Sequence, residues 1–142
     1  YKGCFSVPWV IINGETETGF TYHYMVEKFD EGKILLQQTI DIEPDDTAFS
    51  LFHRQIKLGL EPFEQVVEMT LAGEPGTEQT GEGSYYSRAV PHDGIIDPSW
   101  PDEQIDRFIR AMHFPPHPGA IAVIDGQKHE VQSLKEYHSL HA

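Results

Sequence analysis

Residues 18–38 constrain the fold more than any other stretch of this 142-residue chain. Residues 20–26 alternate between aromatic and smaller or polar side chains, which is typical of a β-strand. Residues 33–42 carry a second strand pattern, and the six-residue connection 27–32 suits an antiparallel hairpin with a longer loop. Asp30 lies in that loop, close to a glycine. Loops that a rigid sheet holds in place often carry catalytic or binding groups, so Asp30 is the first candidate site residue.

Composition describes an acidic protein of one domain, with enough residues for one hydrophobic core. The chain has 10 Lys and Arg against 23 Asp and Glu, a formal net charge of -13 at pH 7. That charge disfavours partners that are nucleic acids or anionic membranes. No apolar run reaches the ~18 residues of a membrane-spanning helix. The single cysteine, Cys4, cannot form a disulfide within the chain, which fits a reducing, cytoplasmic location.

The longest helical pattern covers residues 48–71, where apolar side chains recur at spacings of three and four. Gly59 and Pro62 are expected to break or kink this helix. Asp45 or Asp46 is expected to cap its amino-terminal end, because a carboxylate there can accept from free backbone N–H groups.

Further elements complete an α/β pattern. Residues 103–112 predict the second main helix, and 120–124 with 128–132 predict a second hairpin around an Asp-Gly turn. The apolar run 5–12 is compatible with a short helix or a buried strand. Mixed or antiparallel strands with two main helices are therefore the expected fold.

Other segments are predicted to be irregular. Residues 74–83 have no apolar side chain and many glycines, which predicts a polar surface loop. Residues 84–90 suit a short extended segment, and residues 92–94 form a turn pattern. The last ten residues, 133–142, are polar and are expected to fray.

No short motif of established chemistry occurs. The sequence lacks a phosphate-binding glycine loop, a CxxC pair, an HExxH zinc motif and a nucleophile elbow. Its eight histidines are scattered, so no metal site is expected, and His23 is interpreted as a structural residue. Sequence patterns alone therefore indicate an α/β domain with a carboxylate in a hairpin loop, and they indicate no activity.

Several short motifs, taken together in their order and spacing, indicate a protein family more specifically than any one of them does alone. These are Tyr1-Lys2-Gly3, Trp9, Asn13-Gly14-Glu15, Thr18-Gly19, His23, Asp30-Glu31-Gly32, Leu36-Gln37, Asp45-Asp46-Thr47, Ser87-Arg88, Asp93-Gly94 and Ile109-Arg110-Ala111. They resemble the folate-dependent formyltransferases, which include methionyl-tRNA formyltransferase and the sugar-nucleotide N-formyltransferases. The resemblance implies the carboxy-terminal half of a Rossmann-type catalytic domain over residues 1–132, followed by a polar tail over 133–142.

The resemblance also implies a chemistry. In this family a formyl group passes from 10-formyltetrahydrofolate to an amine, and an Asn, a His and an Asp surround the transfer point. Asp30 matches the Asp, while the Asn-x-His pattern does not occur in this sequence. The pterin of the folate is expected along the loop of Met25, Val26, Glu27, Lys28, Phe29 and Asp30. We therefore expect these residues alone not to catalyse formyl transfer.

The acceptor implied by the resemblance is the amine of an amino sugar nucleotide or a similar small molecule. A fragment of methionyl-tRNA formyltransferase is the alternative, which the acidic charge disfavours, and a non-catalytic remnant or interaction module is another. An amino-terminal half or a second copy of the chain is a possible protein partner. Arg88 or Arg110 is expected near an anion. The residues expected to bind the acceptor are Tyr1, Gly3, Trp9, Tyr86, Arg88, Asp93 and Gly94.

Overall fold

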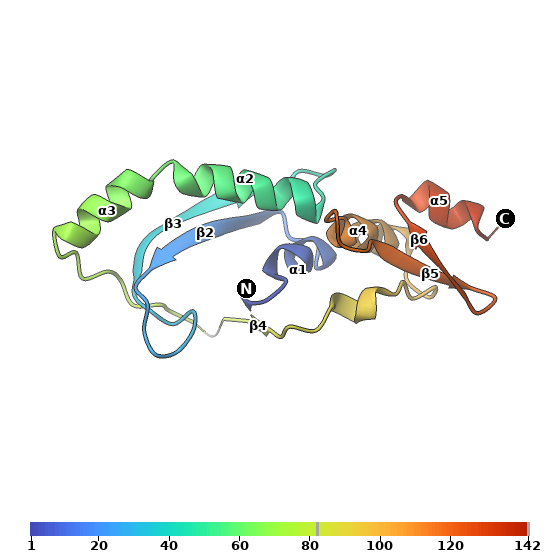
Figure 1. Cartoon of the computed structure of the whole chain (residues 1–142), viewed down its shortest axis with the longest axis horizontal. Helices are drawn as coiled ribbons and strands as arrows, with labels where there is room; N and C mark the ends of the chain where they lie inside the picture. The colour runs from blue at the N-terminus through green and yellow to red at the C-terminus, as the bar shows by residue number, and fades with distance from the viewer. Residues whose placement is uncertain (82, 142) are drawn as a thin grey trace.

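The computed structural model describes residues 1–81 and 83–141 of the chain, and its elements mix helices with short strands (Figure 1). This confirms the expected α/β class. In chain order the elements are β1 (Lys2–Gly3), α1 (Ser6–Ile12), β2 (Glu17–His23), β3 (Ile34–Asp41), α2 (Ala48–Leu60), α3 (Phe63–Leu71), β4 (Tyr85–Tyr86), the 3-10 helix η1 (Pro91–Gly94), α4 (Asp102–Met112), β5 (Ala120–Ile124), β6 (Gln127–Val131) and α5 (Leu134–Ser139).

The strands pair two by two. β2 with β3 and β5 with β6 form antiparallel hairpins, as the sequence predicts. β1 and β4 form a short parallel pair, in which Lys2 lies opposite Tyr85 and Gly3 lies opposite Tyr86. This parallel pair brings the beginning of the chain beside a segment that is distant in sequence.

Helices α2 and α3 run along the β2–β3 hairpin (Figure 1). Two side-chain hydrogen bonds fix α2 on the hairpin. The Tyr22 hydroxyl donates to the carbonyl oxygen of Gly59 at 2.6 Å, and Gln55 Nε2 donates to the carbonyl oxygen of Gly19 at 2.9 Å. The hairpin that carries Asp30 is therefore held by the longest helix of the chain.

The expected break in the helix over residues 48–71 is confirmed, since α2 ends at Leu60 and α3 begins at Phe63. The expected cap is wrong. Thr47 caps α2, because its hydroxyl accepts from the backbone N–H of Ser50 at 3.1 Å while the Ser50 hydroxyl accepts from the N–H of Thr47 at 2.9 Å. The Asp46 carboxylate instead accepts from Arg54, at 2.9 Å for Nη1 to Oδ1, and is buried.

The main core lies where α1 packs on α4 (Figure 1). The apolar run near the amino terminus is thus a helix, which settles the open choice between helix and strand. Burying each large apolar side chain contributes ~1.5–3 kcal/mol. The largest fully buried side chains are Phe108, Ile11, Leu51, Val10, Val131 and Pro91.

The carboxy-terminal segment does not fray as expected. Leu134–Ser139 form α5, whose first turn is capped by the Ser133 hydroxyl as it accepts from the N–H of Glu136 at 3.2 Å. Tyr137 packs into the main core and is buried. The last residue of the expected tail, 142, lies outside the described residues. Within the described part of the chain, no helix is both long and apolar enough to cross a membrane.

Candidate active site

Asp30 lies in the loop between β2 and β3, as the sequence predicts, in an uncommon backbone conformation. Its φ is 59°, in the left-handed region that costs about 1 kcal/mol for a residue with a Cβ. The loop is also tight at Gly32, where an added Cβ would lie 1.6 Å from the carbonyl oxygen of Tyr24. Such a conformation persists only where neighbouring contacts hold it.

Two contacts hold Asp30. The backbone N–H of Gly3 donates to its carboxylate Oδ2 at 3.1 Å. The Gln79 side chain donates from Nε2 to the carbonyl oxygen of Asp30 at 2.9 Å and to that of Gly32 at 2.7 Å. The carboxylate is thereby fixed relative to β1, and its backbone is fixed relative to the glycine-rich loop.

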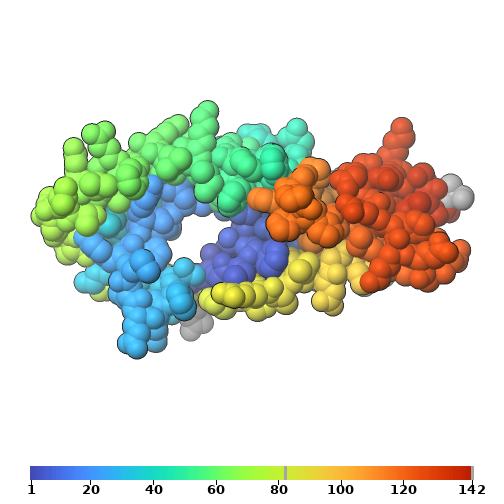
Figure 2. Space-filling view, viewed as in Figure 1, coloured from blue at the N-terminus to red at the C-terminus, as the bar shows by residue number. Residues whose placement is uncertain are grey.

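Asp30 lines a cavity of about 350 Å³ between the β2–β3 hairpin and α1, which we call the polar cavity. Figure 2 shows the molecule hollowed in this region. His23 also lines it, and its Nδ1 is 2.9 Å from the carbonyl oxygen of Tyr24. Since a carbonyl oxygen only accepts, Nδ1 carries the proton and Nε2 of the neutral ring is left as an acceptor. The complete lining is Tyr1, Lys2, Gly3, Ser6, Gly19, Phe20, Thr21, His23, Asp30, Ile34, Gln37 and Gln79.

Three of the residues expected to bind the acceptor form an aromatic stack beside this cavity. The rings of Tyr1 and Tyr86 are 5.3 Å apart and inclined by 6°, and those of Trp9 and Tyr86 are 5.0 Å apart and inclined by 26°. Gly3, a fourth, pairs with Tyr86 in the β1–β4 ladder. Three expected residues from the beginning of the chain therefore meet a fourth, Tyr86, which is distant in sequence.

Hydrogen bonds at the edge of the aromatic stack fix the two tyrosines. Asn13 Nδ2 donates to the Tyr1 hydroxyl at 2.9 Å and to the Tyr86 hydroxyl at 3.2 Å. The Tyr1 hydroxyl donates to Glu15 Oε1 at 2.6 Å. Burial first and the Glu15 hydrogen bond second raise the pKa of Tyr1 to about 12, so its hydroxyl is a neutral donor at neutral pH.

The other three expected acceptor residues lie farther along the chain. Arg88 is exposed and follows β4, and Asp93 is exposed in η1. Gly94 is buried with a φ of 75°, which fits a turn-forming role. None of the three lines the polar cavity. His92, which the sequence did not single out, links η1 to the aromatic stack, because its ring lies 5.6 Å from that of Trp9.

Arg110, which was expected near an anion, is engaged within the fold. Its Nε donates to Asp106 Oδ2 at 2.8 Å, and its Nη1 donates to the carbonyl oxygen of Asp46 at 2.8 Å. These bonds give Arg110 a structural role at the junction of α4 and α2.

The expected pterin loop extends away from the core at the end of the hairpin (Figure 1). Met25 is 91% exposed and Phe29 is 84% exposed, so two large apolar side chains face outwards beside Asp30. No group of three His, Cys, Asp or Glu side chains within residues 1–81 and 83–141 is placed to hold a metal ion.

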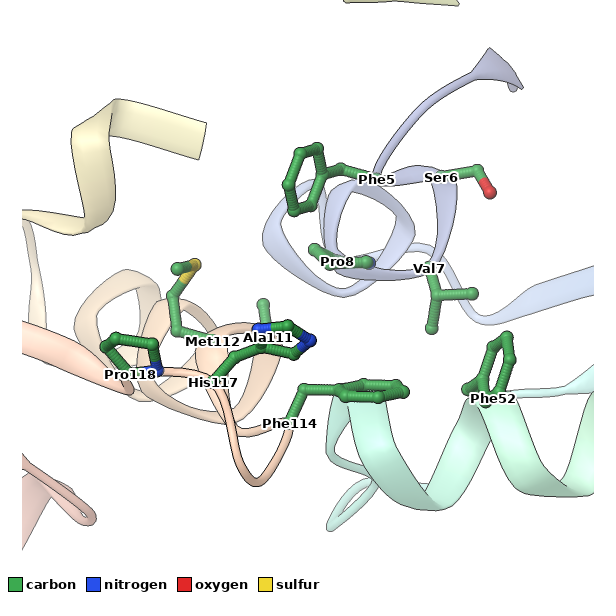
Figure 3. Close-up of a pocket in the computed structure, with 10 residues that line it drawn as sticks. All are labelled: Phe5, Ser6, Val7, Pro8, Phe52, Ala111, Met112, Phe114, His117 and Pro118. Carbon is green, nitrogen blue, oxygen red and sulfur yellow. The ribbon is translucent and has the colours of Figure 1, made fainter. Parts of the chain in front are cut away.

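A second, apolar cavity of about 300 Å³ lies between α1, α2 and the segment that follows α4 (Figure 3). Phe5 and Val7 line it from the side of α1, Phe52 from α2, and Phe114 from the following segment. Ser6 lines both this apolar cavity and the polar cavity.

Sequence comparison adds two matches that together cover most of the chain. The family model described as "Formyl transferase" matches residues 1–67. The model described as "Formyl transferase, C-terminal domain" matches residues 88–142. Asp30, Gly3 and the first part of the aromatic stack lie in the first match.

Individual relatives agree with the family models. The GDP-perosamine N-formyltransferase of Brucella melitensis biotype 1 is 56% identical over 140 residues, which are 99% of this chain and 54% of that protein. The crystal structure of a 4-N formyltransferase from Francisella tularensis matches with a TM-score of 0.79 and 26% identity, over 91% of this chain and 55% of that one. An N-formyltransferase from Helicobacter canadensis, solved in complex with folinic acid and dTDP-3-aminofucose, matches with a TM-score of 0.77 and 27% identity, over 90% of this chain and 48% of that one. This chain thus spans about half the length of the relatives it matches, and it belongs to the formyltransferase family.

Proposed function

We propose that this chain is the carboxy-terminal part of a formyltransferase that acts on the amine of an amino sugar nucleotide, with 10-formyltetrahydrofolate as the formyl donor. The observation that carries the proposal is the 56% identity, over 99% of this chain, to a GDP-perosamine N-formyltransferase. The placement of Asp30 in the polar cavity, beside residues from the beginning of the chain, supports it.

Asp30 is the proposed catalytic residue. An amine that attacks a formyl carbon must lose a proton, and a fixed carboxylate can hold a protonated histidine or relay the proton through water. The bond from Gly3 to Oδ2 and the bonds from Gln79 to the loop backbone hold the carboxylate at the cavity wall. The Asn and His that complete the set in this family are not supplied by an Asn-x-His pattern in these 142 residues.

The loop of residues 25–30 is the proposed site of the pterin. Exposed Met25 and Phe29 offer apolar contact to a flat ring, while the backbone groups of the loop offer donors and acceptors to its polar edge. Folinic acid in the Helicobacter canadensis structure supports a folate donor. When bound, 10-formyltetrahydrofolate supplies the formyl carbon that the amine attacks.

The aromatic stack of Tyr1, Tyr86 and Trp9 is the proposed wall for the acceptor. Flat aromatic faces with polar edges suit sugars and nucleotide bases. The Tyr1 hydroxyl, neutral at neutral pH, and Asn13 bring hydrogen-bonding groups to this wall. Arg88, Asp93 and Gly94 complete the proposed acceptor-binding set from the segment after β4. A cytoplasmic location fits a folate-dependent reaction on a soluble nucleotide.

Formyl transfer by the full-length gene product tests the proposal. Amino sugars linked to GDP and to dTDP are offered together with 10-formyltetrahydrofolate, and the N-formyl product is measured by mass spectrometry. We expect turnover of at least one amino sugar nucleotide and none of methionyl-tRNA. The 142 residues alone are the matched comparison and are expected to be inactive. Turnover of methionyl-tRNA alone would contradict the proposed acceptor, and absence of turnover with every amine would favour a non-catalytic module.

A further inference from the structure

The glycine-rich segment 74–83, expected as a plain surface loop, is attached to the β2–β3 hairpin. Thr77 and Ile34 exchange two backbone hydrogen bonds, each 2.8 Å long, at the start of β3. Lys33 Nζ and Glu78 Oε1 are 3.0 Å apart. This attachment puts the next residue, Gln79, beside the Asp30 loop.

Gln79 uses both hydrogens of its side-chain amide on that loop. The two hydrogens of Nε2 go to two carbonyl oxygens, those of Asp30 and Gly32, which lie on either side of Glu31. A side-chain amide can thereby do what a strand neighbour does in a sheet, which is to satisfy backbone acceptors and fix their spacing. The side chain is half-buried and lies at the wall of the polar cavity.

The hydrogen bond from Gln79 stabilises Asp30, whose backbone conformation is unfavourable. Asp30 has a left-handed backbone, and its carboxylate direction follows from that backbone. Gly3 fixes one carboxylate oxygen, but it does not contact the backbone of the loop in these hydrogen bonds. Among the residues that the structure describes, Gln79 is the side chain that hydrogen-bonds to the Asp30 backbone.

We propose that Gln79 is a positioning residue for the formyl-transfer site, one that fixes the direction of the Asp30 carboxylate without touching the reacting groups. This inference rests on the proposed catalytic role of Asp30. Displacement of a catalytic group by about 1 Å can reduce turnover by up to ~10²-fold.

The first experiment measures the loop directly, in the full-length gene product, and needs no activity. Gln79→Leu keeps the size of the side chain but removes both donors, and Gln79→Glu presents an acceptor to two carbonyl oxygens. Backbone ¹⁵N order parameters for residues 29–32 are expected to fall from ~0.85 to below about 0.6 in both variants. The ¹³C shift of the Asp30 carboxyl is expected to move as well. Thr80→Ala, in the exposed residue that follows Gln79, is the matched control and is expected to change neither.

The second experiment measures turnover in the full-length gene product. Both Gln79 variants are expected to lower kcat by roughly tenfold to a hundredfold, with KM for the folate donor changed by less than about twofold. Unchanged order parameters in Gln79→Leu would overturn the inference, as would a loosened loop with unchanged kcat. If the wild-type protein transfers no formyl group, the proposed function fails, and the loop measurement alone still decides whether Gln79 holds Asp30.

Discussion

The backbone N–H of Gly3 donates to Oδ2 of Asp30 at 3.1 Å, and this bond joins the beginning of the chain to the loop of the first hairpin. Gly3 also lies against Tyr86 in the parallel β1–β4 pair. One glycine thus connects the proposed catalytic carboxylate to the aromatic stack. A substitution at Gly3 is expected to change the stability of the fold, whereas a substitution at Asp30 is expected to change turnover.

Gly3→Ala is expected to destabilise the chain. An added Cβ would lie 2.2 Å from the carbonyl oxygen of Tyr86, and φ is already +89°. We expect a loss of roughly 2–3 kcal/mol in the free energy of unfolding, measured by urea denaturation. Gly73→Ala is the matched control, because φ there is +76° with no atom within 4 Å of the added Cβ. It should cost only about 1 kcal/mol. Equal losses would show that the close approach to Tyr86 is unimportant.

Asp30→Asn is expected to remove turnover from the full-length gene product while leaving folate binding in place. The amide keeps the shape of the carboxylate and an oxygen for the Gly3 N–H, but it does not take up a proton. We expect kcat to fall by about 10²–10⁴-fold, with the Kd of folinic acid changed by less than about twofold. Glu31→Gln, the exposed neighbour, should have little effect on either quantity. Parallel loss of binding and turnover would identify Asp30 as a structural residue.

Asp46 is expected to make stability depend on acid pH. Burial by itself raises the pKa of this carboxyl, but hydrogen bonds from Arg54, from Ser50 and from the N–H of Glu43 outweigh it and lower the pKa below 3.8. A lowered folded-state pKa means that the contribution is present above pH 3.8, the unfolded value, and is lost as pH falls through the folded value. The Tm of the wild type should therefore fall more than that of Asp46→Asn between about pH 5 and pH 2.

The control for this pH dependence is Asp45→Asn, in the exposed neighbour of Asp46. Its Tm should follow pH as the wild type does. At neutral pH, Asp46→Asn should itself cost about 2–3 kcal/mol, because Arg54 loses its charged partner. If both variants keep the acid dependence of the wild type, Asp46 is not its source.

Tyr1 is expected to ionise well above the ordinary pKa of tyrosine in an alkaline titration followed by tyrosinate absorbance. Its pKa is raised to about 12 by burial and by the hydrogen bond to Glu15, so Tyr1→Phe should remove a transition near that pH. Because the neutral form is favoured in the folded state, the stabilisation is present below pH 10 and is lost as pH rises towards 12. Glu15→Gln should lower the midpoint, whereas Tyr85→Phe should leave it in place.

Much of the fold could be predicted because its elements repeat a local pattern. The β2–β3 alternation and the apolar spacing of α2 and α4 are visible over five or more consecutive residues, and the second hairpin is marked by its Asp125-Gly126 turn. The cap was expected at Asp45 or Asp46 but lies at Thr47, since Asp and Thr are both good capping residues. The burial of Asp46 by Arg54 decides between them, and burial is a tertiary property.

The site was predictable only in part, for a related reason. Asp30 is marked by its place in a hairpin loop, and the family motifs include Tyr1, Gly3 and Trp9, whereas Tyr86 was expected only as an aromatic residue suited to the acceptor. The two-residue strands that bring these together have no periodicity to detect. Gln79 lies in a segment without apolar residues, so nothing local distinguishes it from a solvent-exposed glutamine. α5 was missed because six helical residues carry too few apolar positions to separate them from a polar tail.

The short β1–β4 pair has a consequence for the order in which the molecule assembles. It joins Lys2 to Tyr85, so it closes more than half of the chain into one large loop, whereas β2–β3 joins near neighbours. Contacts that close long loops form later than local ones, since they carry a greater entropic cost. The hairpin with Asp30 can form early, whereas the α1–α4 core and the β1–β4 pair both close long loops, and the polar cavity exists only after the two-residue pair has closed. Reversible opening of those few hydrogen bonds would dismantle the cavity while the rest of the protein stayed folded.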